Sequence, residues 1–191
     1  MSTRLIVKGL DMIKKVVPSF DEIDGKKFPT LGELNDWDTA RERIYELLDG
    51  TNFLCQSAVV QQYNEYIIWN SWANCNKVLA PINFISTDER NIPILGFRYF
   101  EPVVKDSDFY KYNDNESLLK LGVFAAEHNI SFEEVRKFFK DVEDCCLEFN
   151  LNEDDIYYNL SNIGYNSDLG LRVIDYGLVE SSSDKKFELV M

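Results

Sequence analysis

The chain has 191 residues, of which 45% are hydrophobic, which is enough for a domain with a sizeable core and excludes a disordered chain. Its 33 acidic and 20 basic residues give a formal net charge of −13. This charge disfavours direct binding to nucleic acid or to an anionic membrane, and favours a protein partner with a basic surface. No apolar run approaches the roughly twenty residues of a transmembrane helix. The first residues have too short an apolar core for a secretory signal, so we expect a cytoplasmic protein.

The cysteines and the histidine do not form a metal-binding pattern. The four cysteines include no CxxC pair, and His128 is the only histidine, so we expect no zinc site. Cys145 and Cys146 fall on the apolar side of a predicted helix and should pack in a core. His128 lies at a predicted helix end, where a capping role is favoured over a catalytic one.

The first half of the chain is predicted to combine short helices with strands. Leu10, Ile13, Val16 and Val17 are spaced for a short helix that ends near Pro18. Further along, the predicted segments are a loop over residues 18–37, a helix over 39–48 capped by Asp36 or Asp38, a strand over 51–60, a helix over 61–73, and two strands over 78–85 and 92–100 that form a hairpin.

The second half begins with two helices. Leu118, Leu119, Leu121 and Phe124 indicate a helix over residues 117–128. The sequence Ser131-Phe132-Glu133-Glu134 is a capping box, which predicts that a helix starts here and continues to about residue 148. Its apolar residues recur every three or four positions, which indicates one wide buried face.

A β-hairpin is predicted near the C-terminal end. Residues 163–165 and 171–174 are apolar runs, and the loop between them is rich in turn residues. Asn162 stands at one mouth of this hairpin and Asp175 at the other. Two oxygen ligands brought together in this way suit a hard cation such as magnesium.

Asn162 followed by Asp175-Tyr176-Gly177 resembles the catalytic loop and the Asp-Phe-Gly segment of the protein-kinase-like fold. The resemblance implies that Asn162 and Asp175 bind magnesium. It also implies that the helix over 61–73 matches the small-lobe helix, whose acid, here Glu65, pairs with a strand lysine that orients the ATP phosphates. The implied fold is α+β: a truncated kinase-like domain over 1–191, with a small-lobe-like part over 1–102 and a reduced large-lobe-like part over 116–191.

The chain departs from this family at the parts that perform catalysis. The position five residues before Asn162, where the family has its catalytic base, holds Tyr157, and a phenol titrates near pH ~10. No two glycines are spaced as G-x-G, and no lysine lies between Gly50 and Glu65. These departures predict a pseudokinase-like protein with no cofactor, although Mg-ATP stays open as an alternative.

Three functions follow as hypotheses. The first is a non-catalytic kinase-like protein that binds and inhibits a partner protein, in the manner of a phage or viral effector acting on a host factor. The second is an active magnesium-dependent phosphotransferase in which Asp155 replaces the missing base and Asn162 and Asp175 hold the metal. The third is an acidic nucleic-acid mimic, which needs evenly spaced carboxylates on one face.

Overall fold

The protein is a mixed α+β protein, as the sequence predicts. The computed structural model describes residues 4–9, 12–71, 77–104, 115–149 and 160–177, which contain four α-helices and two antiparallel sheets. The chain divides into two compact units. The first comprises residues 1–70 and 81–98, and the second comprises residues 71–80 and 99–191.

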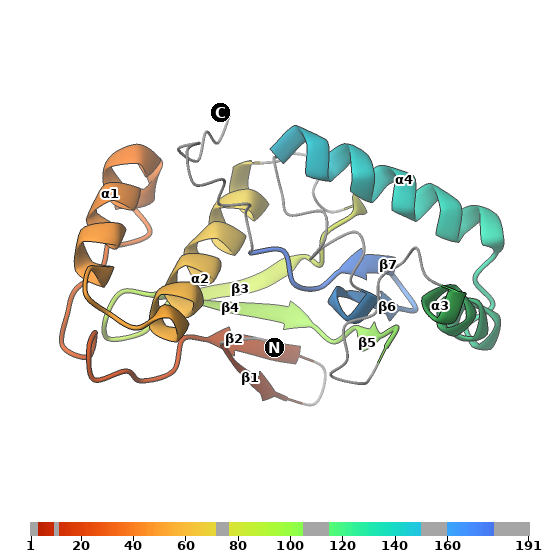
Figure 1. Cartoon of the computed structure of the whole chain (residues 1–191), viewed down its shortest axis with the longest axis horizontal. Helices are drawn as coiled ribbons and strands as arrows, with labels where there is room; N and C mark the ends of the chain where they lie inside the picture. The colour runs from red at the N-terminus through yellow and green to blue at the C-terminus, as the bar shows by residue number, and fades with distance from the viewer. Residues whose placement is uncertain (1–3, 10–11, 72–76, 105–114, 150–159, 178–191) are drawn as a thin grey trace. The chain divides into compact units, whose positions relative to one another are not determined.

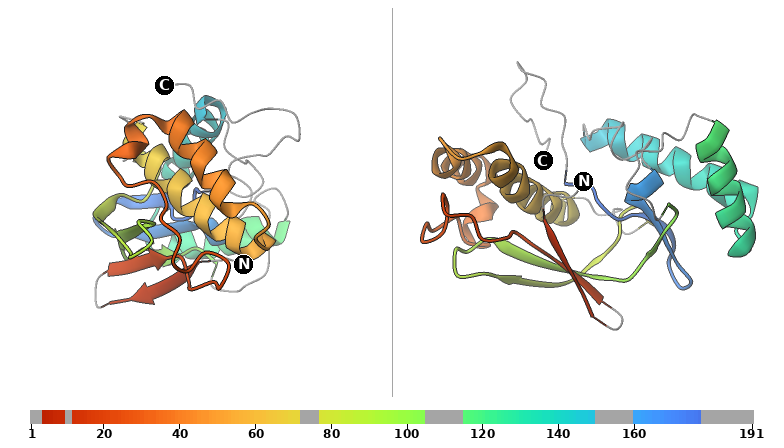
Figure 2. Two further views of the ribbon diagram at one scale, coloured as in Figure 1. Left: turned by 90° about the vertical axis from the view of Figure 1, so that its left-hand side faces the viewer. Right: turned by 60° about the horizontal axis from the view of Figure 1, so that its bottom comes forward.

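The first unit is a four-stranded antiparallel sheet with helices on one face. The strands are β1 (Leu5–Lys8), β2 (Met12–Val16), β3 (Ile82–Thr87) and β4 (Pro93–Arg98), and their order across the sheet is β1-β2-β4-β3. Helix α2 (Phe53–Ser71) lies across one face of this sheet, with α1 (Trp37–Leu48) beside it (Figure 1). The second view in Figure 2 shows both helices on the same side of the strands.

Two sequence predictions in this unit are wrong. Residues 12–16 form strand β2 and not the predicted short helix. The segment pairs with β1 on one side and β4 on the other, and Lys15 points into the unit. Residues 53–60 belong to α2 and not to a strand. An apolar run of this length has no clear period of two or of 3.6, so a buried helix and a buried strand look alike in sequence.

The predicted helix over 39–48 is confirmed as α1. Asp36 is its N-cap, and the Asp36 carboxylate accepts a hydrogen bond from the Thr39 amide. A short 3₁₀ helix, η1 (Glu33–Asn35), precedes it. Ala40, Ile44 and Leu48 are buried, which places one face of α1 in the core of the unit.

The second unit holds a three-stranded antiparallel sheet in the order β5-β6-β7. Its elements are β5 (Glu101–Pro102), α3 (Asn115–Glu127), α4 (Phe132–Phe149), η3 (Leu160–Asn162), β6 (Ile163–Asn166) and β7 (Gly170–Val173). The predicted hairpin of residues 163–174 is therefore confirmed. Leu79 forms an isolated parallel bridge to Val173, which ties residues 77–80 to this sheet.

The capping box and the packing cysteines are confirmed in α4. The Ser131 hydroxyl donates to the Glu134 carboxylate at 2.7 Å, and the Glu134 amide donates to Ser131 Oγ at 3.2 Å. Cys145 and Cys146 are buried on the apolar face. Among the described helices, none is long and apolar enough to span a membrane.

Candidate functional site

Glu65 lies at the centre of a buried ionic cluster in the first unit. Its Oε1 accepts from the Lys15 ammonium of β2 at 2.6 Å, and its Oε2 accepts from Arg4 Nη1 at 2.5 Å. The Glu65 side chain is fully buried, and the Lys15 side chain is 3% exposed. The structure thus places Glu65 inside the protein, where it joins α2 to the N-terminal strands.

Gln62, one helical turn before Glu65, fixes the geometry of this cluster. Its side-chain amide donates to the backbone carbonyls of Lys15 and Pro93, each at 2.8 Å, and its Oε1 accepts from Arg4 Nη1 at 3.2 Å. One side chain therefore contacts β2, β4 and the cation of Arg4. This arrangement sets the distance between α2 and the sheet and orients the lysine toward the carboxylate.

The cluster places two cations around one carboxylate in a buried environment. Burying ions is costly, and mutual attraction repays the cost only where the hydrogen bonds are well formed. Here both carboxylate oxygens accept hydrogen bonds, and the Lys15 ammonium also lies 4.9 Å from the centroid of the Phe97 ring. Buried ionic clusters of this kind are candidates for function as well as for structure.

Lys15 is the residue that the sequence analysis missed. The family resemblance implies a strand lysine shortly before Glu65, but the sequence has no lysine between Gly50 and Glu65. The lysine that contacts Glu65 belongs to β2, and helix α1 lies between β2 and α2 in the chain. The pair Lys14-Lys15 within an apolar segment was the available signal, because in a strand one of two adjacent residues must point inward.

Asn162 and Asp175 lie at the open end of the β6–β7 hairpin in the second unit. Ile163 pairs with Val173, and the Ile174 amide donates to the Asn162 carbonyl at 2.7 Å, which extends the ladder by one position. Asp175 is the next residue. The register thus brings the two predicted metal ligands to the same end of the hairpin.

Tyr176, next to Asp175, anchors this end of the hairpin. Its side chain is fully buried, and its hydroxyl donates to the Ala80 carbonyl at 3.1 Å. The Val173 amide also donates to the Val78 carbonyl at 2.8 Å. Because both contacts hold the segment against residues 78–80, the backbone on either side of Asp175 is fixed by the core of the unit.

Asn162 and Asp175 are of the residue types that supply oxygen ligands to magnesium. An asparagine carbonyl and an aspartate carboxylate are oxygen ligands, and magnesium often takes one or two protein ligands together with waters and phosphate oxygens. In the described part of the chain, His, Cys, Asp and Glu side chains form no group of three that could hold a metal ion. Tyr157 and Asp155 lie outside the described residues.

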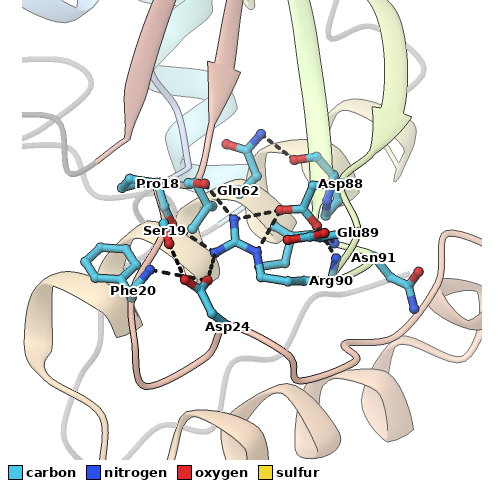
Figure 3. A network of polar contacts seen from close by, with 12 residues as sticks. Pro18, Ser19, Phe20, Asp24, Gln62, Asp88, Glu89, Arg90 and Asn91 are labelled. Atoms are coloured by element: carbon cyan, nitrogen blue, oxygen red, sulfur yellow. Dashed lines mark hydrogen bonds and ion pairs between the residues drawn. The ribbon is translucent and has the colours of Figure 1, made fainter.

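A second polar cluster, around Arg90, is structural. Its guanidinium donates five hydrogen bonds, to the Val17 and Pro18 carbonyls and to the carboxylates of Asp24 and Asp88 (Figure 3). Since a guanidinium has five N–H donors, none is left to bind a ligand. Arg90 therefore ties the turn between β3 and β4 to the loop after β2.

His128 packs between aromatic rings at the end of α3. Its ring centroid is 4.2 Å from that of Phe124 and 4.8 Å from that of Tyr165. Its Nε2 lies 3.5 Å from Glu101 Oε2. The imidazole thus links α3 to β5 and β6, which is a structural role at the helix end.

The second unit also carries an apolar groove beside α3. Its volume is about 390 Å³, and its apolar lining comes from Val103, Val104, Leu119, Val123 and Phe124, with Glu101, Lys120 and Glu127 beside them. Leu119 is 67% exposed and Val123 is 52% exposed. Adjacent apolar side chains with this exposure are typical of surfaces that contact another protein.

Comparison of the chain with models of protein families, with curated proteins and with solved structures found no match.

Proposed function

We propose that this chain is a kinase-like protein that has lost phosphoryl transfer and acts by binding, and thereby inhibiting, a partner protein. The observation that carries the proposal is the contact of 2.6 Å between Lys15 of β2 and Glu65 of α2. In protein kinases a strand lysine and a helix glutamate form such a pair. The hairpin that ends at Asn162 and Asp175 supplies a second, independent point of similarity.

The loss of catalysis is argued from the sequence around this hairpin. Phosphoryl transfer depends on positioning and on charge stabilisation, so each missing part lowers the rate separately. Tyr157 takes the place of the catalytic base, and its phenol cannot accept a proton near neutral pH. No glycine-rich segment is present to cover the phosphates.

Protein binding is supported by the apolar groove beside α3. Exposed Leu119 and Val123 are of the residue types that a partner protein would bury. The net charge of −13 favours approach to a partner with a basic surface, most strongly at low salt. Binding alone, without phosphoryl transfer, is sufficient for inhibition if the bound surface of the partner includes its active site or binding site.

Phosphate transfer from labelled ATP tests the proposal. The full chain is incubated with magnesium and general protein acceptors, beside Asp175→Ala and the control Asp168→Ala, an exposed acid in the hairpin turn. We expect all three proteins to transfer the same background amount. Magnesium-dependent transfer that is lost only in Asp175→Ala would contradict the proposal.

The Lys15–Glu65 contact also favours a second candidate, the active magnesium-dependent phosphotransferase, because it supplies a strand lysine that is absent between Gly50 and Glu65. This candidate requires Mg-ATP to bind through Lys15. Calorimetry with Lys15→Met and the control Lys14→Met, an exposed neighbour, tests it. The candidate is supported if Lys15→Met abolishes Mg-ATP binding, Lys14→Met preserves it, and Asp155→Asn loses turnover. If the unmodified chain does not bind ATP at millimolar concentration, the candidate is excluded.

A further inference from the structure

We propose that two features of the described part of the first unit's sheet form a docking site: the edge strand β1, and the face opposite α1 and α2, called here the uncovered face because no described helix lies on it. The occupant is an extended acidic and apolar segment of a partner protein, which adds to β1 as a fifth strand. This inference rests on the proposed function, since it adds a second binding surface for a partner, distinct from the groove beside α3, and gives the chemistry of the segment that binds there. It is carried by the register of the strands, by the exposure of their side chains and by the local charge.

The register assigns each strand residue to one face. Lys15 points toward α2, because its ammonium contacts Glu65. Cross-strand partners share a face and neighbours along a strand alternate, so Lys14 points to the opposite side. Lys14 pairs with Val7 of β1 and with Gly96 of β4, and Gly96 in turn pairs with Phe84 of β3. One row of the uncovered face therefore crosses all four strands.

This face is apolar and exposed. Leu5 and Val7 are 54% and 53% exposed, and Phe84 is 43% exposed. Gly96 lies beneath Phe84 and Met12, because a Cβ built at Gly96 would approach the Phe84 Cβ to 3.0 Å and the Met12 Cε to 3.2 Å. Both described helices of this unit lie on the opposite face (Figure 2).

Strand β1 is an edge strand with unusual exposure. It pairs only with β2 among the described strands, and all four of its residues are exposed. Exposed edges with apolar side chains pair readily with another strand, and proteins usually protect them with charges or proline. Adding a strand to such an edge is a common mode of peptide recognition, in which backbone hydrogen bonds give affinity and alternate side chains give specificity.

Local charge decides the chemistry of the added segment. The four strands contain no Asp or Glu, in a chain that has 33 such residues. The charged side chains that the four described strands place on the uncovered face are basic: Lys14 lies 5.3 Å from the centroid of the Phe84 ring, and Arg98 pairs with Met12 in the next row. An incoming strand that alternates acidic and apolar residues would meet these cations and the apolar row together.

The net charge of the whole chain does not contradict this assignment. Coulombic interactions between exposed charges are screened within about 8–10 Å at physiological salt, so contact is governed by the nearest charges. An anionic membrane is a poorer occupant, because the remaining surface is strongly acidic and a few cations contribute only about 1 kcal/mol each. A membrane also cannot use the backbone groups of an edge strand.

Peptide binding to the full chain tests the proposal. The probes are two nine-residue peptides with the same valines, one alternating them with glutamate and the other with lysine. A third probe is the glutamate peptide with alternate backbone N-methyl groups. We expect the glutamate peptide to bind at least tenfold more tightly than the other two and to protect the β1 amides from hydrogen exchange.

Site variants complete the test. Leu5→Glu should weaken binding of the glutamate peptide at least fivefold. Leu54→Glu, an equally exposed leucine on α2, should leave it unchanged. Equal binding of the glutamate and lysine peptides, or equal effects of the two variants, would overturn the proposal.

Two other results would assign the edge to a different occupant. Protection of the β1 amides in a concentration-dependent dimer, without peptide, would assign the edge to a second copy of the chain. Binding to phosphatidylserine vesicles that Leu5→Glu abolishes, without peptide binding, would assign it to a membrane.

Peptide binding at β1 and phosphate transfer are measured separately, so the docking site and the proposed loss of catalysis can fail independently. Loss of this docking site with no phosphate transfer would leave a non-catalytic protein whose partner binds elsewhere. Peptide binding at β1 together with magnesium-dependent transfer would contradict the loss of catalysis and keep the docking site.

Discussion

At the scale of single residues, Glu65 determines how the N-terminal strands attach to α2. One carboxylate oxygen of Glu65 accepts a hydrogen bond from Lys15 and the other from Arg4, and all three side chains are buried. A buried ion pair contributes little compared with apolar packing, but removing one partner leaves an uncompensated buried charge. The cluster is therefore a strong constraint on the fold even though its net contribution to stability is small.

Glu65→Gln should destabilise the protein by about 3–5 kcal/mol, because the neutral amide leaves two buried cations without their counter-charge. Urea unfolding, followed by circular dichroism, measures the change in the free energy of unfolding. Glu42→Gln is the control, since Glu42 is an exposed acid on α1 and its replacement should change stability by less than about 0.5 kcal/mol. Equal effects of the two variants would show that the buried cluster does not form.

Residue-level prediction from the sequence succeeded where local signals decide the structure. Asp36 is one of the two predicted caps, the other being Asp38, and Asn162 and Asp175 lie at the hairpin mouth that two apolar runs and the turn residues between them predict. The local signal for Lys15 was weaker. In a strand one of the adjacent residues Lys14 and Lys15 must point inward, but a buried lysine departs from the polar and apolar alternation by which a strand is recognised. The burial of Lys15 depends on Glu65, fifty residues later in the chain.

At the scale of elements, the start of α4 is defined by the exchange of hydrogen bonds between Ser131 and Glu134. The Ser131 hydroxyl and amide lower the pKa of the Glu134 carboxyl from its usual value. Because the pKa is lowered in the folded state, the stabilisation is complete above the usual glutamate pKa. It is lost as the pH falls through the lowered pKa of the folded protein.

Glu134→Gln should therefore be less stable than the unmodified protein near neutral pH, and the difference should shrink in acid as Glu134 becomes protonated. Urea unfolding from about pH 7 down to about pH 3 measures this difference. Glu133→Gln, an exposed neighbour in the same turn, is the control and should show a smaller effect throughout. A difference that grows in acid would contradict the assigned cap.

The close approach of β5 and β6 depends on Gly164. A Cβ at this position would lie 2.8 Å from the Phe100 Cβ and 3.3 Å from the Glu101 carbonyl oxygen. Gly164→Ala should cost roughly 1–3 kcal/mol, because the neighbouring backbone must shift. Gly122→Ala is the matched control: it lies in α3 with no neighbour within 4 Å, and alanine should stabilise the helix by up to about 1 kcal/mol. Calorimetry measures the melting temperature of both variants. We expect Gly164→Ala to lower it and Gly122→Ala to raise it, and equal changes in the two would contradict the close approach of β5 and β6.

The elements that sequence reasoning placed correctly carry their own start or stop signals. The capping box of α4 and the turn residues of the β6–β7 hairpin are such signals. The errors at β2 and at the first turns of α2 come from apolar segments without them. In both segments the conformation is decided by the sheet and helix packed against them.

At the scale of the whole molecule, the α+β class, which the sequence resemblance implies, is confirmed by four α-helices and two antiparallel sheets in the described residues. The kinase-like fold remains a proposal supported by two local arrangements, Lys15 with Glu65 and Asn162 with Asp175. The first arises from residues fifty positions apart, which composition and local pattern cannot bring together. The docking edge at β1 could not be predicted either, because residues 10–17 were interpreted as a helix.

The proposed loss of phosphoryl transfer from a kinase-like arrangement is tested most directly by measuring ATP turnover. The full chain is assayed at saturating Mg-ATP beside Asp175→Ala, with labelled phosphate as the readout. Active protein kinases turn over about 1–100 times per second. We predict that the chain releases and transfers no more phosphate than Asp175→Ala. Magnesium-dependent turnover that Asp175→Ala abolishes and Asp168→Ala preserves would contradict the account.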